Sequence, residues 1–226
     1  MDNQTDRKIE KFFSKYPLTK FTKKEGIINA EEQPRGVYYL KSGYVRMYTI
    51  TQEGYELTLN IFKPGTFFPL TWAIADIDNV YFYEALTDSE INLAPKDKSL
   101  TFIKNNSDIL FDINRRTLTG LDAILTRLQY LILGNAYQRL ANSFLMLGAR
   151  FGVKTNGSIK LTLTFTEQDL ANLAGVTRET VSLELKKLKR DGYIKKDEGY
   201  YTINKIGELR NESLIYYEDK ALPYTF

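Results

Sequence analysis

The sequence predicts an α+β fold: an N-terminal antiparallel β-roll, jelly-roll-like in its strand pattern, followed by a long helix and a C-terminal winged helix-turn-helix. Three observations predict it: short strands punctuated by glycines, one long helical stretch after them, and two short capped helices near the end. We expect the roll at 1–97, the long helix at 98–136, the winged domain at 137–212 and an aromatic tail at 213–226.

The composition is that of a globular chain with two hydrophobic cores. Of the 226 residues, 43% are hydrophobic and 13% are aromatic, enough apolar material for two domains. The N-terminal stretch is polar, and the longest apolar-rich run, Phe67 to Ala75, is far shorter than the roughly 20 residues of a membrane span. We therefore expect a cytoplasmic protein, and the absence of Cys agrees with a reducing compartment.

Regularly spaced glycines organise the first half of the chain. We expect strands at 37–40, 45–50, 57–62 and 84–93. Gly43, Gly54 and Gly65 are evenly spaced among them, and hairpin loops need glycine where the backbone takes a positive φ. Short strands with regular glycine turns are typical of an antiparallel roll or barrel.

A long helical stretch follows, from about Lys98 to Gly134, with Pro95 before it and Gly120 as the only interruption. Its apolar face consists of Leu118, Leu121, Ile124, Leu125, Leu128 and Ile132. The length of this stripe predicts that the helix pairs with a second copy of itself as a dimer seam. The alternative is that the stripe only covers the β-roll.

Two short helices are predicted within residues 166–190. Thr166 begins a capping box with Asp169, and Gly175 provides the turn between the helices. Thr177 caps the second helix, in which Val181, Leu185 and Leu188 recur as a buried stripe. This pattern predicts a helix-turn-helix whose second helix enters DNA; the alternative is an ordinary helical hairpin with a solvated charged face.

The exposed face of the second helix has side chains that can read bases. Arg178 can bind guanine with two hydrogen bonds, and Glu179 can accept one from cytosine N4. We expect Ser182 and Leu183 to lie on the same reading surface. The predicted phosphate contacts are Thr166, Gln168, Thr177, Thr180, Lys186, Lys189, Lys195 and Lys196.

The charge distribution supports this interpretation. Basic and acidic residues are equal in number in residues 1–135, so the whole net charge of +3 comes from residues 136–226. Asp191-Gly192 ends the second helix, and residues 194–203 can form a two-strand wing around Glu198-Gly199. From Lys186 to Lys196 basic residues greatly outnumber acidic ones, and such clustering is what neutralises phosphates.

The order of these elements resembles the Crp/Fnr superfamily of bacterial transcription regulators over nearly the whole chain. The resemblance rests on residues 37–46, on Arg139-Leu140-Ala141 with Leu145, Leu147 and Arg150-Phe151-Gly152, and most specifically on Asp169-Leu170-Ala171, Gly175 and residues 177–182. It implies a homodimer on a palindromic duplex, with Arg178 and Glu179 touching bases and Thr177 and Thr180 near phosphates. It also implies an effector that reorients the recognition helices through a hinge near residues 134–137.

One position departs from the family pattern. Many members have a second Arg directly after the Val-Ser or Val-Gly pair, and this chain has Leu183 there. Leucine can contact a thymine methyl group but cannot donate a hydrogen bond to guanine. We therefore expect the half-site to differ from the typical family consensus at that base pair.

The sequence excludes some classes of effector but does not identify one. With no Cys and no His, the chain cannot hold the iron–sulfur cluster or haem of some family members, and only carboxylate metal sites remain conceivable. The resemblance also disfavours cyclic AMP as the effector. Family members that bind cyclic nucleotides hold the phosphate with an Arg, and residues 65–68 and 79–84 of this chain contain none. Where the member that binds cyclic AMP has a Thr-Ser pair for the base, this chain has Ile124 and Leu125, which cannot form a hydrogen bond with it.

An aromatic segment is the remaining candidate for an effector pocket. It comprises Phe67, Phe68, Trp72, Tyr81, Phe82 and Tyr83, with Arg115 and Arg116 as candidate partners for an anionic ligand. The alternatives are that these aromatic residues are simply core, that the two arginines are a solvated helix face, and that no small-molecule effector exists.

We expect no enzyme, no cofactor and no metal site. The chain has no His for a nucleophile–base pair and no GxxxxGK[ST] phosphate loop, and a cupin-like oxygenase would need His ligands. The main alternative is a non-enzymatic module whose winged helix docks a protein partner. We expect the aromatic tail to pack on the chain or on its dimer partner, with contact to RNA polymerase as a further candidate role.

Overall fold

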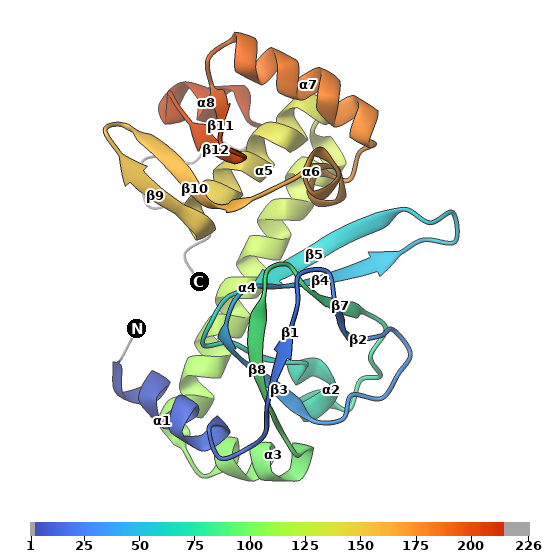
Figure 1. The fold of residues 1–226 in the computed structure, drawn as a ribbon, viewed down its shortest axis with the longest axis vertical. Coiled ribbons are helices and arrows are strands. Elements are labelled where there is room, and N and C mark those ends of the chain that lie inside the picture. The colour runs from blue at the N-terminus through green and yellow to red at the C-terminus, as the bar shows by residue number, and fades with distance from the viewer. Residues whose placement is uncertain (1–2, 215–226) are drawn as a thin grey trace. The chain divides into compact units, whose positions relative to one another are not determined.

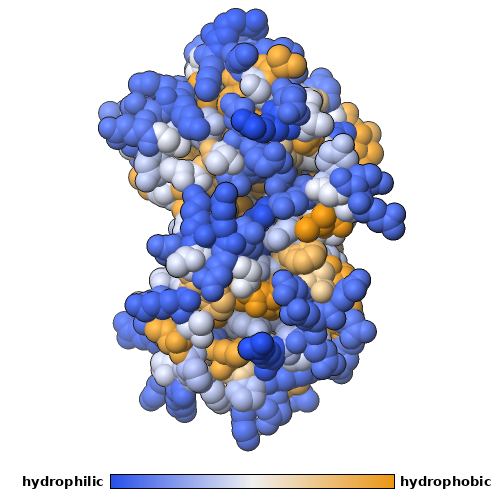
Figure 2. Space-filling view, turned by 45° about the vertical axis from the view of Figure 1, so that its right-hand side comes forward, coloured by the Kyte–Doolittle hydropathy of each residue, from blue (hydrophilic) through white to orange (hydrophobic). Residues whose placement is uncertain are grey.

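The computed structural model describes residues 3–214, which form two compact units with the boundary between Asn114 and Arg115 (Figure 1). The aromatic residues predicted to pack as a C-terminal tail lie outside this described part. Within residues 3–214, no helix has the combination of length and apolar character that a membrane span requires. Hydrophilic side chains cover most of the face shown in Figure 2, as expected when each unit closes its own core.

The first unit contains two antiparallel four-stranded sheets, which confirms the predicted roll. One sheet has the order β1 (Leu18–Phe21), β8 (Ser89–Ala94), β3 (Val37–Ser42), β6 (Phe67–Phe68). The other has the order β2 (Gly26–Ile28), β7 (Phe82–Ala85), β4 (Val45–Ile50), β5 (Glu56–Phe62). Gly43, Gly54 and Gly65 all have positive φ, as predicted for the turns between these strands.

The prediction of a single strand at 84–93 is wrong. The chain turns between β7 and β8, and these two strands belong to different sheets. Hydrogen bonds hold this turn: Leu86 N–H donates to Tyr44 O at 2.8 Å, and Tyr44 N–H donates to Thr87 Oγ1 at 3.0 Å. Gly43 is required beside it, since a Cβ there would lie 2.3 Å from Asp88 O. The strand boundary is therefore set by a contact between distant parts of the chain.

The single helix expected from about Lys98 to Gly134 is two helices. Helix α3 (Lys96–Lys104) ends before α4 (Ser107–Leu133) begins, and the intervening Asn106 donates its side-chain amide to Phe102 O at 2.8 Å. An asparagine side chain that bonds local backbone competes with continued helix. The long apolar stripe lies on α4 alone.

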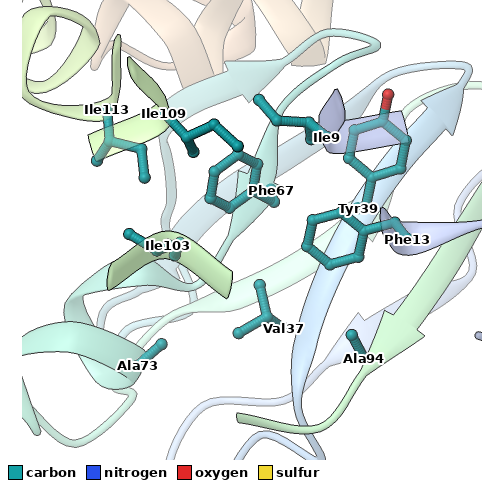
Figure 3. Close-up of a cluster of buried hydrophobic side chains, with 10 residues drawn as sticks. All are labelled: Ile9, Phe13, Val37, Tyr39, Phe67, Ala73, Ala94, Ile103, Ile109 and Ile113. Atoms are coloured by element: carbon teal, nitrogen blue, oxygen red, sulfur yellow. The ribbon is translucent and has the colours of Figure 1, made fainter. Parts of the chain in front are cut away.

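Helices α1 (Asn3–Phe13) and α2 (Leu70–Ala75) were not predicted, and α1 closes one of the two cores of the roll. Figure 3 shows how Phe13 of α1 meets Tyr39 of β3 and Phe67 of β6. The Phe13 and Tyr39 rings stack with their centroids 4.9 Å apart, and the Phe13 and Phe67 centroids are 5.6 Å apart. This core also includes Ile109 of α4.

The second unit is built around α5 (Ala136–Phe151). It continues with β9 (Gly152–Thr155), β10 (Ser158–Thr164), α6 (Glu167–Ala174), α7 (Arg178–Arg190), β11 (Ile194–Asp197), β12 (Tyr200–Ile203) and α8 (Ile206–Glu212). The strands form one sheet of order β11-β12-β10-β9. The predicted wing is confirmed as the β11–β12 hairpin, with Glu198 and Gly199 both at positive φ in its two-residue turn. Strands β9 and β10 were not predicted.

Candidate DNA-binding surface

Helices α6 and α7 begin and end where local sequence signals place them. Thr166 Oγ1 accepts a hydrogen bond from Asp169 N–H at 3.1 Å, and the Asp169 carboxylate accepts one from Thr166 N–H at 2.8 Å, which is the predicted capping box. Gly175 ends α6 with φ 62°, a left-handed conformation that favours glycine. Thr177 then caps α7 by accepting from Thr180 N–H at 3.2 Å. These caps fix where α7 starts.

One face of α7 is buried in the second unit. Val181, Leu185 and Leu188 are at most 1% exposed, as their spacing predicted. Together with buried residues of α5 and α6 they form the helical core that carries α7, and the Phe144 ring of α5 contacts Tyr201 of β12 edge-on at 5.2 Å. Close packing against α5 and α6 therefore fixes the orientation of α7.

The other face of α7 presents the predicted base-reading residues to solvent. Arg178 and Glu179, in the first turn, are exposed, Ser182 is half-buried, and Leu183 is exposed. Their spacing of three to four residues places them on neighbouring ridges of one helix surface. The structure thus brings all four predicted base-reading residues together.

The basic residues of α7 differ in what they contact. Lys187 forms an ion pair with Glu184 at 2.9 Å, and Arg190 forms one with Asp191 at 2.9 Å. Lys186 and Lys189 are exposed, and neither has an ion pair within residues 3–214. Of the basic residues of α7, the two lysines that were predicted to contact phosphate are therefore the ones whose charge is not offset by a close carboxylate.

The wing adds exposed positive charge on β11. Lys195 and Lys196 are both exposed, and Lys196 Nζ lies 4.6 Å from the centre of the Tyr201 ring. This cation–π contact places the Lys196 ammonium group over the Tyr201 ring, and the side chain as a whole stays exposed. Both wing lysines present their positive charge to solvent.

The predicted phosphate contacts with hydroxyl and amide groups are engaged within their own helices. Thr166 donates its hydroxyl to the Asp169 carboxylate at 2.8 Å, and Gln168 donates its amide to Asn172 Oδ1 at 2.8 Å. Thr177 and Thr180 share a hydrogen bond between their hydroxyl groups at 3.0 Å. To donate to a phosphate, Thr166 would have to exchange its hydrogen bond, whereas Gln168 keeps a second amide N–H and one hydroxyl of the Thr177–Thr180 pair keeps a free proton.

Helix α4 has an apolar face that stays exposed. Leu118, Leu121, Ile124, Leu125, Leu128 and Ile132 are between 45% and 71% exposed. Spacings of three and four residues alternate from Leu118 to Ile132, which is the heptad pattern of a coiled-coil seam. On the opposite side of α4, Tyr130 and Arg127 are buried in the second unit. The part of α4 that belongs to the second unit therefore packs on that unit by one side only.

Two arginines, whose structural role sequence reasoning missed, connect α4 and α5 with the helix-turn-helix. Arg127 donates to Leu173 O at 2.8 Å, near the C-terminal end of α6. Arg139 donates to Gly134 O at 2.9 Å and to Gly175 O at 3.5 Å. Cations that bond the last carbonyls of a helix also complement its dipole. Arg139 is among the residues that carry the family resemblance and Arg127 is not, but for both only the fold reveals the acceptors.

The turn between α4 and α5 coincides with the expected hinge. It consists of Gly134 and Asn135, and Asn135 caps α5 in a capping box with Gln138. Gly134 fits closely, since a Cβ there would lie 2.5 Å from Tyr130 O. The structure therefore defines a short, well-capped corner at this point of the chain.

The aromatic residues of the candidate effector pocket do not gather at one place. Phe67 and Trp72 pack in the core shown in Figure 3, whereas Phe68, Tyr81 and Tyr83 pack in the other core of the roll. The Phe68 and Tyr83 rings stack 5.1 Å apart, and burial raises the pKa of Tyr83. Phe67 and Phe68 are adjacent in one strand, so their side chains point to opposite faces.

The two charged candidates for ligand binding differ in exposure. Arg115 is exposed and Arg116 is half-buried, and both belong to the second unit, whereas the aromatic segment belongs to the first. Within the roll, the buried Arg46 is 8% exposed and lies between Glu84 at 3.0 Å and Glu56 at 2.7 Å. Two carboxylates offset its charge.

Two family models match most of the chain. The model described as a Crp-like helix-turn-helix domain matches residues 138–212, and the model described as a cyclic nucleotide-binding domain matches residues 18–106. Both matches follow the units of the structure: the first covers α5 to α8 and the second covers the strands of the roll. They agree with the antiparallel roll, long helix and winged helix-turn-helix described above.

Relatives extend the likeness over nearly the full length. The chain is 28% identical over 210 residues to the anaerobic regulatory protein of Bacillus subtilis, covering 92% of this chain and 83% of that protein. It is 29% identical over 162 residues to the transcriptional regulator SdrP of Thermus thermophilus, covering 72% and 76%. A solved transcriptional regulator of the CRP/FNR family, also from Thermus thermophilus, has a TM-score of 0.69 at 26% identity, covering 86% of this chain and 97% of the other.

Proposed function

Since the chain belongs to the Crp/Fnr family of transcription regulators, we propose that it works as a homodimer that binds a palindromic operator in duplex DNA through α7. The observation that carries the proposal is the exposed face of α7, where Arg178 and Glu179 stand on a capped, closely packed helix. A helix presented in this way fits the major groove and offers its N-terminal residues to base edges.

Lysines on α7 and on the wing supply the sequence-independent part of this binding. Lys186 and Lys189 on the helix, with Lys195 and Lys196 on β11, flank the reading surface with accessible positive charge. Each phosphate that a lysine neutralises releases a counterion, so the slope of log affinity against log salt concentration becomes steeper with the number of phosphates contacted. Thr166, Gln168, Thr177 and Thr180 would add hydrogen bonds to phosphates, for which Thr166 would have to leave the Asp169 carboxylate.

The exposed heptad face of α4 is the proposed seam between two copies. Pairing two such faces would bury a stripe of leucine and isoleucine side chains that one chain leaves in water. Two recognition helices about 34 Å apart would then meet successive major grooves on one side of the duplex. This explains why the helix that leads into the DNA-binding unit keeps an apolar outer side.

We propose that an effector other than cyclic AMP, haem or an iron–sulfur cluster biases the dimer between two states. Residues 64–95 contain no Lys or Arg to hold a cyclic phosphate, and the chain has no Cys or His. The α4–α5 corner at Gly134–Asn135 is the proposed hinge, and Arg127 and Arg139 transmit its position to α6 through their bonds to Leu173 O and Gly175 O. Such a switch works through unequal effector affinity for the two states.

Selection of binding sites from random duplex DNA with the purified full-length chain tests the DNA-binding proposal. The expected result is an inverted repeat whose half-sites are one helical turn apart, bound with an affinity that falls steeply with salt. Enrichment of no sequence would contradict it and would favour the alternative of a winged helix that docks a protein. The chain with both Arg178→Ala and Glu179→Ala serves as control, since it keeps the lysines but loses base contacts.

The effector proposal needs a separate test. Mass spectrometry of small molecules released from the purified chain identifies candidate ligands, and DNA affinity is then compared between the stripped and the reloaded chain. A reloaded ligand should change the affinity at least several-fold. Identical affinity across the recovered molecules would contradict the switch but leave DNA binding intact.

A further inference from the structure

Leu183 is an apolar side chain on an otherwise polar reading surface. It is 60% exposed, whereas Val181, Leu185 and Leu188 of the same helix are at most 1% exposed. A leucine with more than half of its surface in water contributes less to folding than a buried one, because apolar surface stabilises the fold only where it is buried. Most of the Leu183 surface is therefore left available to a partner outside the second unit.

The place of Leu183 on α7 puts it among the base-reading residues. It lies one helical turn after Glu179, on the same ridge, and directly follows Ser182. Lys187, the next residue along that ridge, is bound to Glu184 at 2.9 Å, which draws its charge to the side of the helix. Leu183 is thus an exposed apolar side chain on the same face of α7 as the predicted base-reading residues.

In the major groove, the bases offer one apolar group. Guanine, adenine and cytosine present hydrogen-bond donors and acceptors at their edges, and thymine presents one acceptor together with its C5 methyl group. A leucine side chain cannot satisfy the donors and acceptors, so placing it over those edges would leave them without partners. Contact with a methyl group removes apolar surface of both partners from water.

Resting on the DNA binding proposed above, we propose that Leu183 determines specificity by packing against a thymine C5 methyl group. The operator then contains in each half-site a T·A pair whose thymine faces Leu183, about one helical turn along α7 from the base that Glu179 contacts. Arg178 and Glu179 select their bases by hydrogen bonds, and Leu183 selects its base by shape and apolar contact. Specificity at this pair depends on a methyl group alone.

Replacing thymine by deoxyuridine tests this directly, because the two bases differ only in that methyl group. Each thymine of the site selected from random duplex DNA is replaced in turn, and the Kd of the wild-type chain is measured by fluorescence anisotropy. One position in each half-site should weaken binding about fourfold, and replacing both should weaken it by about tenfold or more. In the Leu183→Ala chain, the same replacements should have almost no effect.

A further variant and a stability measurement separate specificity from folding. Leu183→Met keeps an apolar side chain, so it should retain the deoxyuridine effect, and Leu183→Ala should keep the thermal unfolding profile because alanine suits an exposed helix position. A selected site in which no deoxyuridine replacement distinguishes wild type from Leu183→Ala overturns the Leu183 proposal and leaves DNA binding standing. A chain that selects no sequence at all overturns both.

Discussion

Helices α4 and α7 have apolar stripes of similar helical spacing in opposite surroundings. The stripe of α7 is buried in its own unit, whereas that of α4 is about half-exposed along its length. Helical periodicity shows that a face needs an apolar partner but does not say where that partner is. For α7 the partners are α5 and α6; for α4 we propose a second copy of the chain. The contrast separates side chains that stabilise one unit from those that assemble two.

The largest effect is expected from truncating the buried stripe. Leu185→Ala should lower the free energy of unfolding of the second unit by about 2–5 kcal/mol, because it leaves a cavity among packed side chains. Urea unfolding followed by far-UV circular dichroism measures this, and the fluorescence of the single tryptophan, Trp72, reports separately on the first unit. The decrease in the free energy of unfolding should be the same at every protein concentration, because Leu185 packs within one chain. A decrease that depends on protein concentration would contradict the distinction between the two helices.

Charging the exposed stripe should leave the fold intact and abolish assembly. A chain with both Leu121→Glu and Leu125→Glu should bind its operator about 100-fold more weakly or worse, because the second half-site contact no longer benefits from the first. Its circular dichroism spectrum should match that of the wild type. Gln129→Glu, an exposed change on the flank of the same helix, is the matched control. Unchanged operator affinity in the double variant would contradict the α4 seam.

A smaller effect is expected from single lysines of α7. Lys186→Gln should reduce affinity for all sequences alike by about three- to tenfold, and the slope of log affinity against log salt should become shallower by about 0.9 for each phosphate no longer neutralised. Lys187→Gln is the control, because Lys187 is already paired with Glu184. Equal salt slopes for the two variants would show that the ion pair with Glu184 does not separate Lys187 from the phosphates.

The smallest effect concerns Tyr201 in the core beneath α7. Its hydroxyl has no hydrogen-bond partner within residues 3–214, and burial raises the pKa of Tyr201 to about 12. The pKa of Tyr201 in the folded chain lies above the ordinary value of 10.0, so the unfolded chain loses the hydroxyl proton at lower pH than the folded chain does. The stability that the protonated Tyr201 provides is therefore complete below pH 10 and is lost as the pH rises toward about 12. Tyr201→Phe should be neutral within about 1 kcal/mol at pH 8 and should unfold less readily than wild type near pH 11. Equal alkaline sensitivity would contradict this role of Tyr201.

The helix-turn-helix could be predicted almost residue by residue because its signals are local. Thr166, Gly175 and Thr177 each act within one helical turn, so their effect is present in a short window of sequence. The wing turn at Glu198-Gly199 is equally local. By contrast, the end of β7 depends on Tyr44 and Gly43, far away in sequence, and the predicted strand ran past this end for that reason.

The effector pocket was the least predictable feature. Six aromatic residues in one segment suggested a common site, but Phe67 and Trp72 pack in one core, Phe68, Tyr81 and Tyr83 pack in the other, and Phe82 stacks on Tyr48 outside both. Alternation along the strand sends Phe67 and Phe68 to opposite faces. The break at Asn105-Asn106 was missed although an asparagine pair before Ser107 is a stop signal followed by a helix start. Arg127 and Arg139 left no signal of their bonds, since backbone acceptors such as Leu173 O and Gly175 O cannot be read from residue types.

The most direct measurement of the central claim is the molar mass of the full-length chain by sedimentation equilibrium, alone and with its selected DNA. Wild type should have twice the mass of the 26.1 kDa chain, and the chain with Leu121→Glu and Leu125→Glu should have the mass of one chain. On the selected DNA, two wild-type chains should be bound per duplex. A single wild-type chain in both conditions would contradict a homodimer joined along α4.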